Sequence, residues 1–329
     1  MLNAELKLNN NIFDNPDMAA TRDGYSEGLL NLGALHNDVV VLTADLTEST
    51  RVEEFSKTYN DRFFECGVAE QNMAGVAAGL AVTGKTPYIS SYATFSPGRN
   101  WEVIRTTIIY NKANVKIAGH HSGLMTAEDG ATHQATEDIA ILRAIPDITI
   151  IVPADSIEAR KATEASYDIQ GPVYLRFTRA NTPIITTENT PFRVSTNQTF
   201  WVGKNPEVSI FATGFILYNS LIAAYELAKE GIEVNVINVS TIKEADIQGI
   251  LKEVNNTKAV VTVEDHQVTG GLGGMISEIL SLNMPTPIEF VGMQDTFGES
   301  GSPDQLLLKY HLDKDSIKEK VKKVISRKK

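Results

Sequence analysis

The sequence has few of the residues that build disulfides, metal clusters or membrane spans. Cys66 is the single cysteine among 329 residues, which excludes an internal disulfide and a cysteine-based metal cluster. No window reaches the apolar length of a membrane span, and the polar start MLNAELKLNNNIFDNP lacks the apolar core of a signal peptide. A formal net charge of −11 argues against nucleic acid or an anionic membrane as the main partner. A reducing cytoplasm is therefore the expected location.

The chain does have a regular alternation of short β-branched runs and helical patterns. The runs predict strands at 39–46, 86–92, 114–120, 148–154 and 173–179, with helices at 20–35, 69–82, 96–110 and 156–168. After a stretch rich in Thr, Asn and Pro (180–198), strand patterns return at 208–214, 234–242, 259–266 and 287–293. Continuous apolar strands that alternate with helices favour a parallel sheet covered on both faces.

We therefore expect an α/β fold of two domains, each a mostly parallel sheet with helices on both faces. The expected boundaries are an N-terminal extension (1–18), a first domain (19–185), a linker (186–205) and a second domain (206–329). The basic C-terminal helix is interpreted as a solvated surface. The glycine-rich segment 265–274 is either an anion-binding loop or a place where a helix packs closely.

The stretch FFECGVAEQNMAGVAAGLAVTG (63–84) sets a carboxylate at the head of a small, apolar run. A helix over 69–82 would bury a stripe of Met73, Val76, Ala77 and Leu80, with Glu70 at its edge. A buried carboxylate without a partner is costly, so Glu70 should be paired or hold its proton. The alternative is a first-turn glutamate that the helix dipole favours and water partly covers.

Polar side chains gather after the strands of the first domain, where open α/β sheets carry their chemistry. His120, His121 and His133 fall within HHSGLMTAEDGATH (120–133), which also holds Glu128 and Asp129. This window fits a metal site, a loop that binds a sugar or phosphate, or a loop that is merely polar. In YATFSPGR (92–99), two aromatic residues are either core anchors or a platform for a planar ring.

Several of these motifs together resemble the pyrimidine-binding domain of transketolase. They are VAEQNM (68–73), SYATF (91–95), EDGATHQATEDIAILRAIPDITIIVPAD (128–155) and FTRANTP (177–183), and the likeness extends to 20–33 and 43–50. The second domain looks like the C-terminal domain of the same family. The resemblance covers the chain from about residue 19 and indicates the C-terminal half of a transketolase, encoded apart from its N-terminal half.

The resemblance implies thiamine diphosphate chemistry, in which a glutamate shares a proton with N1′ of the aminopyrimidine. Glu70 matches that glutamate, and an apolar pocket would strengthen the hydrogen bond and raise the pKa of the carboxyl group. Phe95 matches the ring that stacks on the pyrimidine, and Tyr92 a second ring of the pocket. Gly98 stands where the family often has a third aromatic residue. Asp45 matches an acid near the cofactor and is otherwise a turn cap after a strand.

The same resemblance implies a sugar-phosphate site. Arg22, Ser49, His121 and Arg179 match the positions that hold the substrate phosphate, and two guanidinium groups with an imidazole suit that charge. The alternatives are a helix N-terminal arginine for Arg22 and a surface ion pair for Arg179. Asp129 and His133 match the residues beside the sugar hydroxyls near the reacting carbons, so His133 is a candidate catalytic residue together with Glu70. His120 has no assigned role.

A missing motif points to a partner. The family's diphosphate domain carries a GDG motif that binds Mg²⁺ and the diphosphate, and no GDG occurs in this sequence. The resemblance therefore implies a chain that is inactive alone, holds no metal ligands of its own, and joins a separate N-terminal subunit as two copies of each. The expected reaction is ketol transfer from a ketose phosphate to an aldose phosphate, as in the pentose phosphate pathway.

Three other functions remain open at this stage. A 1-deoxyxylulose-5-phosphate synthase shares a DGATHQ-like motif but takes pyruvate as its donor, and it is usually one chain. The beta chain of a 2-oxoacid dehydrogenase feeds a lipoyl carrier and lacks this THQ context. A non-catalytic partner subunit of a thiamine enzyme would have no need for Glu70.

Overall fold

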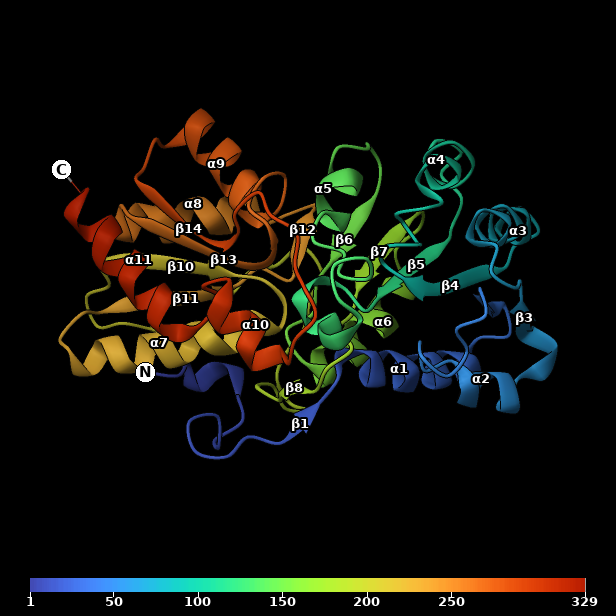
Figure 1. The fold of residues 1–329 in the computed structure, drawn as a ribbon, viewed down its shortest axis with the longest axis horizontal. Helices are drawn as coiled ribbons and strands as arrows, with labels where there is room; N and C mark the ends of the chain where they lie inside the picture. Colours follow the sequence, from blue (N-terminus) through green and yellow to red (C-terminus); the bar gives the residue numbers. More distant parts are fainter. Residues whose placement is uncertain (329) are drawn as a thin grey trace.

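The computed structural model describes residues 1–328 as two large sheets that lie side by side, each with helices on both faces, and a small two-stranded sheet (Figure 1). The strands are β1 (Met18–Ala19), β2 (Val39–Thr43), β3 (Phe63–Glu65), β4 (Thr86–Tyr92), β5 (Lys116–His120), β6 (Thr149–Ile151), β7 (Val173–Arg176), β8 (Thr182–Pro183), β9 (Gln198–Trp201), β10 (Val208–Ala212), β11 (Val234–Asn238), β12 (Thr241–Lys243), β13 (Val260–Gln267) and β14 (Ile288–Met293). The helices are α1 (Thr21–Leu35), α2 (Glu53–Thr58), α3 (Glu70–Val82), α4 (Trp101–Val103), α5 (Asp138–Arg143), α6 (Ser156–Tyr167), α7 (Leu217–Lys229), α8 (Ile247–Thr257), α9 (Leu272–Asn283), α10 (Pro303–Lys309) and α11 (Lys314–Ser326).

The first sheet has seven strands in the order β12-β6-β7-β5-β4-β2-β3. Its strands run parallel except β12, which pairs antiparallel with β6 at the edge. All five residues of β2 are buried, as expected when helices cover both faces. Helix α1 packs closely on α6, because a Cβ at Gly24 would lie 1.8 Å from the Ser156 carbonyl oxygen. The predicted α/β class is confirmed.

The second sheet has five strands in the order β14-β13-β10-β11-β9, and only β9 is antiparallel. Two features tie the two halves together. Strand β12 comes from the second half of the chain and completes the first sheet. Leu6, Leu8 and Ile12 of the N-terminal extension are buried in the core of the second domain. The domain boundaries given above stay a prediction.

Two local predictions were wrong in detail. The helix expected over 96–110 begins at Trp101, because residues before it form a tight turn in which Gly98 lies against Thr94. In α3 the buried residues include Met73, Ala74 and Ala77, whereas Val76 is 38% exposed. Val76 faces away from the sheet, so the buried stripe is rotated from the one predicted.

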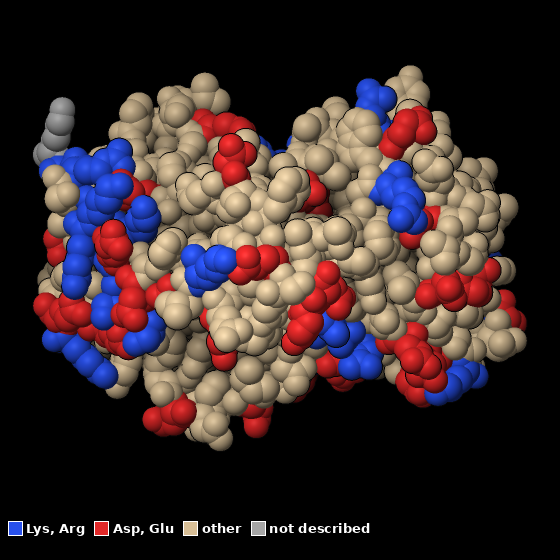
Figure 2. Space-filling model, in the orientation of Figure 1, with Lys and Arg blue, Asp and Glu red and all other residues tan. Residues whose placement is uncertain are grey.

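The basic C-terminal helix α11 lies at the surface, and its basic side chains form ion pairs with acidic residues of the same chain. Its Lys318 and Lys322 form ion pairs with Glu230, and Arg327, just beyond its end, pairs with Glu289. Figure 2 shows Lys and Arg mixed with Asp and Glu over this end of the molecule. Within residues 1–328, no helix has the length and apolar character needed to cross a membrane.

Candidate active site

The predicted site residues lie at the ends of β2, β4, β5 and β7 or on the loops that follow these strands, and at the N-termini of α1 and α3. Parallel strands place these loops at one edge of the sheet. The Glu70 side chain begins α3 and is only 2% exposed. Arg99, on the loop after β4, donates from Nη1 to Glu70 Oε2 at 2.7 Å. The expectation that the buried carboxylate has a partner is therefore correct, and the partner is a residue that the sequence reasoning missed.

Aromatic rings lie beside this ion pair between Arg99 and Glu70. The Arg99 guanidinium lies 4.6 Å from the centroid of the Phe95 ring. Phe95 and Tyr92 are stacked with their centroids 5.8 Å apart, and His133 meets the Phe95 ring edge-on at 5.5 Å. Arg99 thus bridges Glu70 and Phe95, and Phe95, Tyr92 and His133 form an aromatic cluster beside this ion pair.

Three arginines, Arg22, Arg51 and Arg179, place positive charge near His121. Arg22 donates to the Ser49 carbonyl oxygen at 2.8 Å, and Arg179 pairs with Asp129 at 3.4 Å and with Glu128 at 3.0 Å. Burial, with the charges of Arg22, Arg179 and Arg51, lowers the pKa of His121 to about 3. Burial lowers the pKa of Arg22, and the charge of Arg51, which the sequence reasoning did not select, adds to that shift.

We call Arg22, Arg51, His121 and Arg179 the cationic region. Two of its buried atoms have no hydrogen-bond partner within residues 1–328. They are Arg22 Nε and His121 Nδ1. Buried polar groups are nearly always hydrogen-bonded, so unpartnered ones indicate a missing ligand or water. Positive charge, unpartnered polar atoms and a neutral imidazole suit an anionic ligand with several acceptor oxygens.

Two predicted residues are placed less centrally. Asp45 is exposed and adopts a φ of 60°, and its backbone N–H donates to Glu65 Oε1 at 2.7 Å. Ser49 uses its carbonyl oxygen, not its hydroxyl, to bind Arg22. His120 is a core residue: it is fully buried between Tyr25 and Phe177, and burial lowers its pKa well below the usual value.

The second domain fastens the loop that carries Asp129. Asp265 accepts a hydrogen bond from the Leu124 backbone N–H at 3.0 Å. Gln134 donates to the Glu299 carbonyl oxygen at 2.9 Å. A Cβ at Gly123 would lie 2.0 Å from Asp265 Oδ2, and Gly123 has a φ of 65°, so this loop requires glycine. Sequence reasoning assigned no role to the second domain, and the structure shows that holding this loop is one of its roles.

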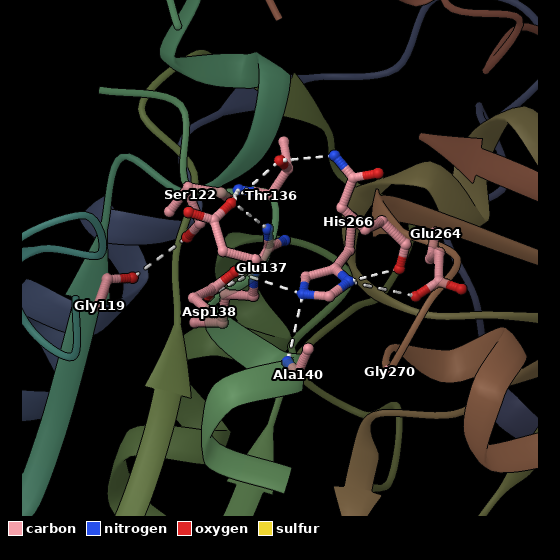
Figure 3. A network of polar contacts seen from close by, with 12 residues as sticks. Gly119, Ser122, Thr136, Glu137, Asp138, Ala140, Glu264, His266 and Gly270 are labelled. Atoms are coloured by element: carbon pink, nitrogen blue, oxygen red, sulfur yellow. Dashed lines mark hydrogen bonds and ion pairs between the residues drawn. The ribbon is translucent and has the colours of Figure 1, made fainter. Parts of the chain in front are cut away.

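A buried polar network joins the two domains beneath the loop (Figure 3). Arg176 pairs with Asp138 at 2.9 Å and donates to the Asp265 carbonyl oxygen. His266 lies between Asp138 and Glu264, at 3.9 and 3.8 Å. Sequence reasoning missed this network because its members lie on strands and helices far apart in the chain, with no local pattern to mark them.

The glycine-rich segment after β13 does not offer a free anion loop. Glu264 accepts hydrogen bonds from the backbone N–H groups of Leu272 and Gly273, each at 2.7 Å. An internal carboxylate therefore occupies the N-terminus of α9, and close packing is the correct interpretation of these glycines. Within residues 1–328, no cluster of three or more His, Cys, Asp or Glu side chains is arranged to hold a metal ion.

Comparison with known families decides the identity of this arrangement. Residues 17–184 match the family described as "Transketolase, pyrimidine binding domain", and residues 201–317 match "Transketolase, C-terminal domain". The chain belongs to the transketolase family. The transketolase chain is also 41% identical over 307 residues to a "Putative transketolase C-terminal section" of Methanocaldococcus jannaschii, covering 91% of this chain and 94% of that protein.

In other relatives the matching region is either nearly the whole protein or about half of a longer one. A 6-deoxy-6-sulfo-D-fructose transketolase subunit of Clostridium sp. (strain MSTE9) is 38% identical, with 93% of this chain and 95% of that protein covered. The human transketolase is 33% identical, and the match covers 94% of this chain but 50% of the human protein. A solved structure titled "Split gene transketolase, inactive beta4 tetramer" is 40% identical with a TM-score of 0.88, covering 94% and 99% of the two chains. The chain therefore corresponds to the C-terminal section of a split transketolase.

Proposed function

We propose that this transketolase chain transfers a two-carbon ketol unit from a ketose phosphate to an aldose phosphate, together with a separate N-terminal subunit. The observation that carries the proposal is the buried Glu70 carboxylate, which Arg99 links to the Phe95 ring and, through it, to the stacked Tyr92 ring. A buried acid next to flat aromatic faces fits the aminopyrimidine half of thiamine diphosphate, which family membership indicates.

At the cofactor end, residues 19–185 would supply the pyrimidine site. Phe95 would stack on the ring, Tyr92 would line the pocket, and Glu70 would share a proton with ring atom N1′. Asp45, although exposed here, remains a candidate at the rim. When bound, the cofactor supplies the nucleophilic carbon that carries the two-carbon unit. The role of the protein is to exclude water, hold the ring and keep that proton on the Glu70–N1′ pair.

At the substrate end, Arg22, Ser49, His121 and Arg179 would bind the terminal phosphate. The neutral His121 can both donate and accept, and the guanidinium groups supply charge-assisted hydrogen bonds. Asp129 and His133 would contact the sugar hydroxyls, with His133 a proton carrier at the reacting end. Arg179 already holds Asp129, so phosphate and hydroxyl recognition are mechanically connected.

Two further points support a partner and a dimer. The exposed face of α3 carries no charge: Val76 is 38% and Val82 85% exposed, and nothing lies within 4 Å of a Cβ built at Gly75 or Gly79. Such a surface favours helix packing between copies of the chain. The 40% identical split-gene protein is titled an inactive tetramer of beta chains. We propose two copies of this chain with two N-terminal subunits, which would carry the diphosphate and Mg²⁺ ligands.

The test is reconstitution with a GDG-bearing N-terminal subunit, thiamine diphosphate and Mg²⁺. We expect ketol transfer between phosphorylated sugars from the pair and none from this chain alone. Activity of the isolated chain, or an inactive pair that binds the cofactor, would contradict the proposal. Release of CO₂ from pyruvate by the pair would instead indicate 1-deoxyxylulose-5-phosphate synthase chemistry.

A further inference from the structure

Arg99 makes two contacts that converge on the proposed pyrimidine site. Its Nη1 donates to Glu70 Oε2 at 2.7 Å, and its guanidinium lies 4.6 Å from the Phe95 ring centroid. Within residues 1–328, Arg99 is the only side chain that hydrogen-bonds the Glu70 carboxylate. The Arg99 side chain is 48% exposed, whereas that of Glu70 is 2% exposed. One end of the ion pair is thus buried and the other lies at the rim.

These are the same two contacts that the proposed function requires of an aminopyrimidine. The ring would need a hydrogen bond to Glu70 and a flat aromatic face on Phe95. A guanidinium is planar, carries N–H donors and stacks on aromatic rings, so it satisfies both requirements. Glu70 and Phe95 therefore already have an internal occupant in the chain on its own.

We propose that Arg99 is a displaceable internal ligand of the pyrimidine site: it pairs with Glu70 and covers Phe95 in the unassembled subunit, and it leaves when thiamine diphosphate binds. This inference rests on the proposed function. It makes Arg99 a positioning residue that competes with the cofactor.

The surroundings of Arg99 permit this movement without a change in the backbone. The neighbouring Asn100 is fully buried and donates to the Glu70 carbonyl oxygen at 3.1 Å and to Ser96 Oγ at 3.2 Å. Gly98 packs so closely that a Cβ there would lie 2.0 Å from the Thr94 carbonyl oxygen. The turn is fixed on both sides of Arg99, so only its half-exposed side chain has to move.

Physical arguments explain both why Arg99 pairs with Glu70 before the cofactor binds and why the pair must break afterwards. Without Arg99, and before the cofactor binds, Glu70 would be a buried carboxylate with no counter-charge, which is strongly unfavourable. With the cofactor in place, a guanidinium held at 2.7 Å from Glu70 Oε2 would occupy the carboxylate oxygen that the proposed function assigns to N1′. Arg99 therefore stabilises the Glu70 carboxylate before the cofactor binds, and it must leave Glu70 when the cofactor binds.

The test measures binding of thiamine diphosphate, and separately of thiamine, to the isolated chain by titration calorimetry. We expect Arg99→Ala to bind both more tightly than the wild type by about fivefold, the factor expected when a partly exposed ion pair need not be broken. Arg105→Ala, which removes an exposed arginine six positions further along the chain, should bind as the wild type does. Equal or weaker binding by Arg99→Ala, or no measurable binding by any variant, would overturn the proposal.

A second variant guards against loss of folding. Arg99→Gln removes the charge but keeps a hydrogen-bond donor for Glu70, and it should also bind more tightly. In the wild type, the Arg99 Nε–H resonance, assigned by its loss in Arg99→Gln, should move to the position of a free arginine on saturation with thiamine diphosphate. An unchanged resonance would show that Arg99 stays in place. Failure of the proposed function would appear separately, as no ketol transfer by the reconstituted wild-type pair.

Discussion

The rings of Tyr92 and His121 are stacked with their centroids 3.9 Å apart and an interplanar angle of 23°. This contact joins the two halves of the candidate site, because Tyr92 belongs to the aromatic cluster with Phe95 and His133, and His121 lies among the arginines Arg22, Arg51 and Arg179. Stacking also helps to bury His121, and burial is the largest cause of its lowered pKa. Stacking on Tyr92 thus helps to keep His121, which we propose binds the substrate phosphate, uncharged.

The first prediction concerns that charge state. The pKa of His121 is lowered to about 3, so its imidazole should stay neutral throughout the range from about pH 5 to 8. The measurement is the ring-proton chemical shift of His121 by NMR in the isolated chain, with the resonance assigned by its loss in His121→Asn. A titration with its midpoint near 6.5 would contradict the burial argument.

The second prediction concerns Arg179. Replacement by alanine removes a charge-assisted hydrogen bond to phosphate, which is worth ~1.5–3 kcal/mol, or roughly a ten- to 150-fold change in KM. We expect this increase for phosphorylated sugars and a much smaller one for unphosphorylated analogues. The control is Arg193→Ala, which removes an exposed arginine from the linker. Equal effects of Arg179→Ala on both kinds of sugar would exclude the phosphate role.

The third prediction concerns Glu264 and pH. Burial raises the pKa of Glu264 to about 8, against an ordinary value of 4.5. The folded chain therefore holds a proton that the unfolded chain releases, so the free energy of unfolding should fall as pH rises from about 4.5 to 8. One such group contributes at most ~1.4 kcal/mol per pH unit.

Glu264→Gln should reduce that slope, while it lowers stability at acidic pH because an acceptor for the α9 N-terminus is lost. Glu158 and Asp265, whose pKa values are raised to about 8 and about 6, contribute in the same direction, so some slope should remain. Glu319→Gln, an exposed acid on α11, is the control. An unchanged slope in Glu264→Gln, measured by chemical denaturation between pH 5 and about 8, would refute the assignment.

The fourth prediction concerns the buried pair between Arg176 and Asp138. Removal of one member leaves an uncompensated buried charge, so Arg176→Met should cost ~3–5 kcal/mol of unfolding free energy. The double variant Arg176→Met with Asp138→Leu should recover a large part of that loss. A double variant as unstable as the single one would show that other contacts of Arg176, such as its hydrogen bond to the Asp265 carbonyl oxygen, dominate.

Sequence reasoning succeeded where the signal is local or periodic. The run 86–92 predicts β4 with its observed bounds, and the helix over 69–82 differs from α3 by one residue. Spacing placed Glu70 at the edge of the buried stripe but left open whether water partly covers it; the structure buries it to 2% exposure. The exposure of Val76 was not predictable, because a run of small apolar residues does not reveal which face meets the sheet.

The remainder depended on contacts between distant segments. Arg99 lies 29 positions from Glu70 on a tight turn, and nothing in YATFSPGR indicates which way its side chain points. Arg176, Asp138 and His266 come from three separate elements that meet only after both domains pack. Such pairs follow from tertiary packing and leave no period in the sequence.

The central claim is that the buried Glu70 carboxylate activates the cofactor. The most direct measurement is ketol transfer by the reconstituted pair with wild-type chain, Glu70→Gln and the control Glu102→Gln, an exposed acid on α4. We predict that Glu70→Gln loses well over 90% of turnover, a barrier increase above ~1.4 kcal/mol, while its fold and assembly are retained and the control is unaffected. Retention of more than about a tenth of the wild-type rate would contradict the account.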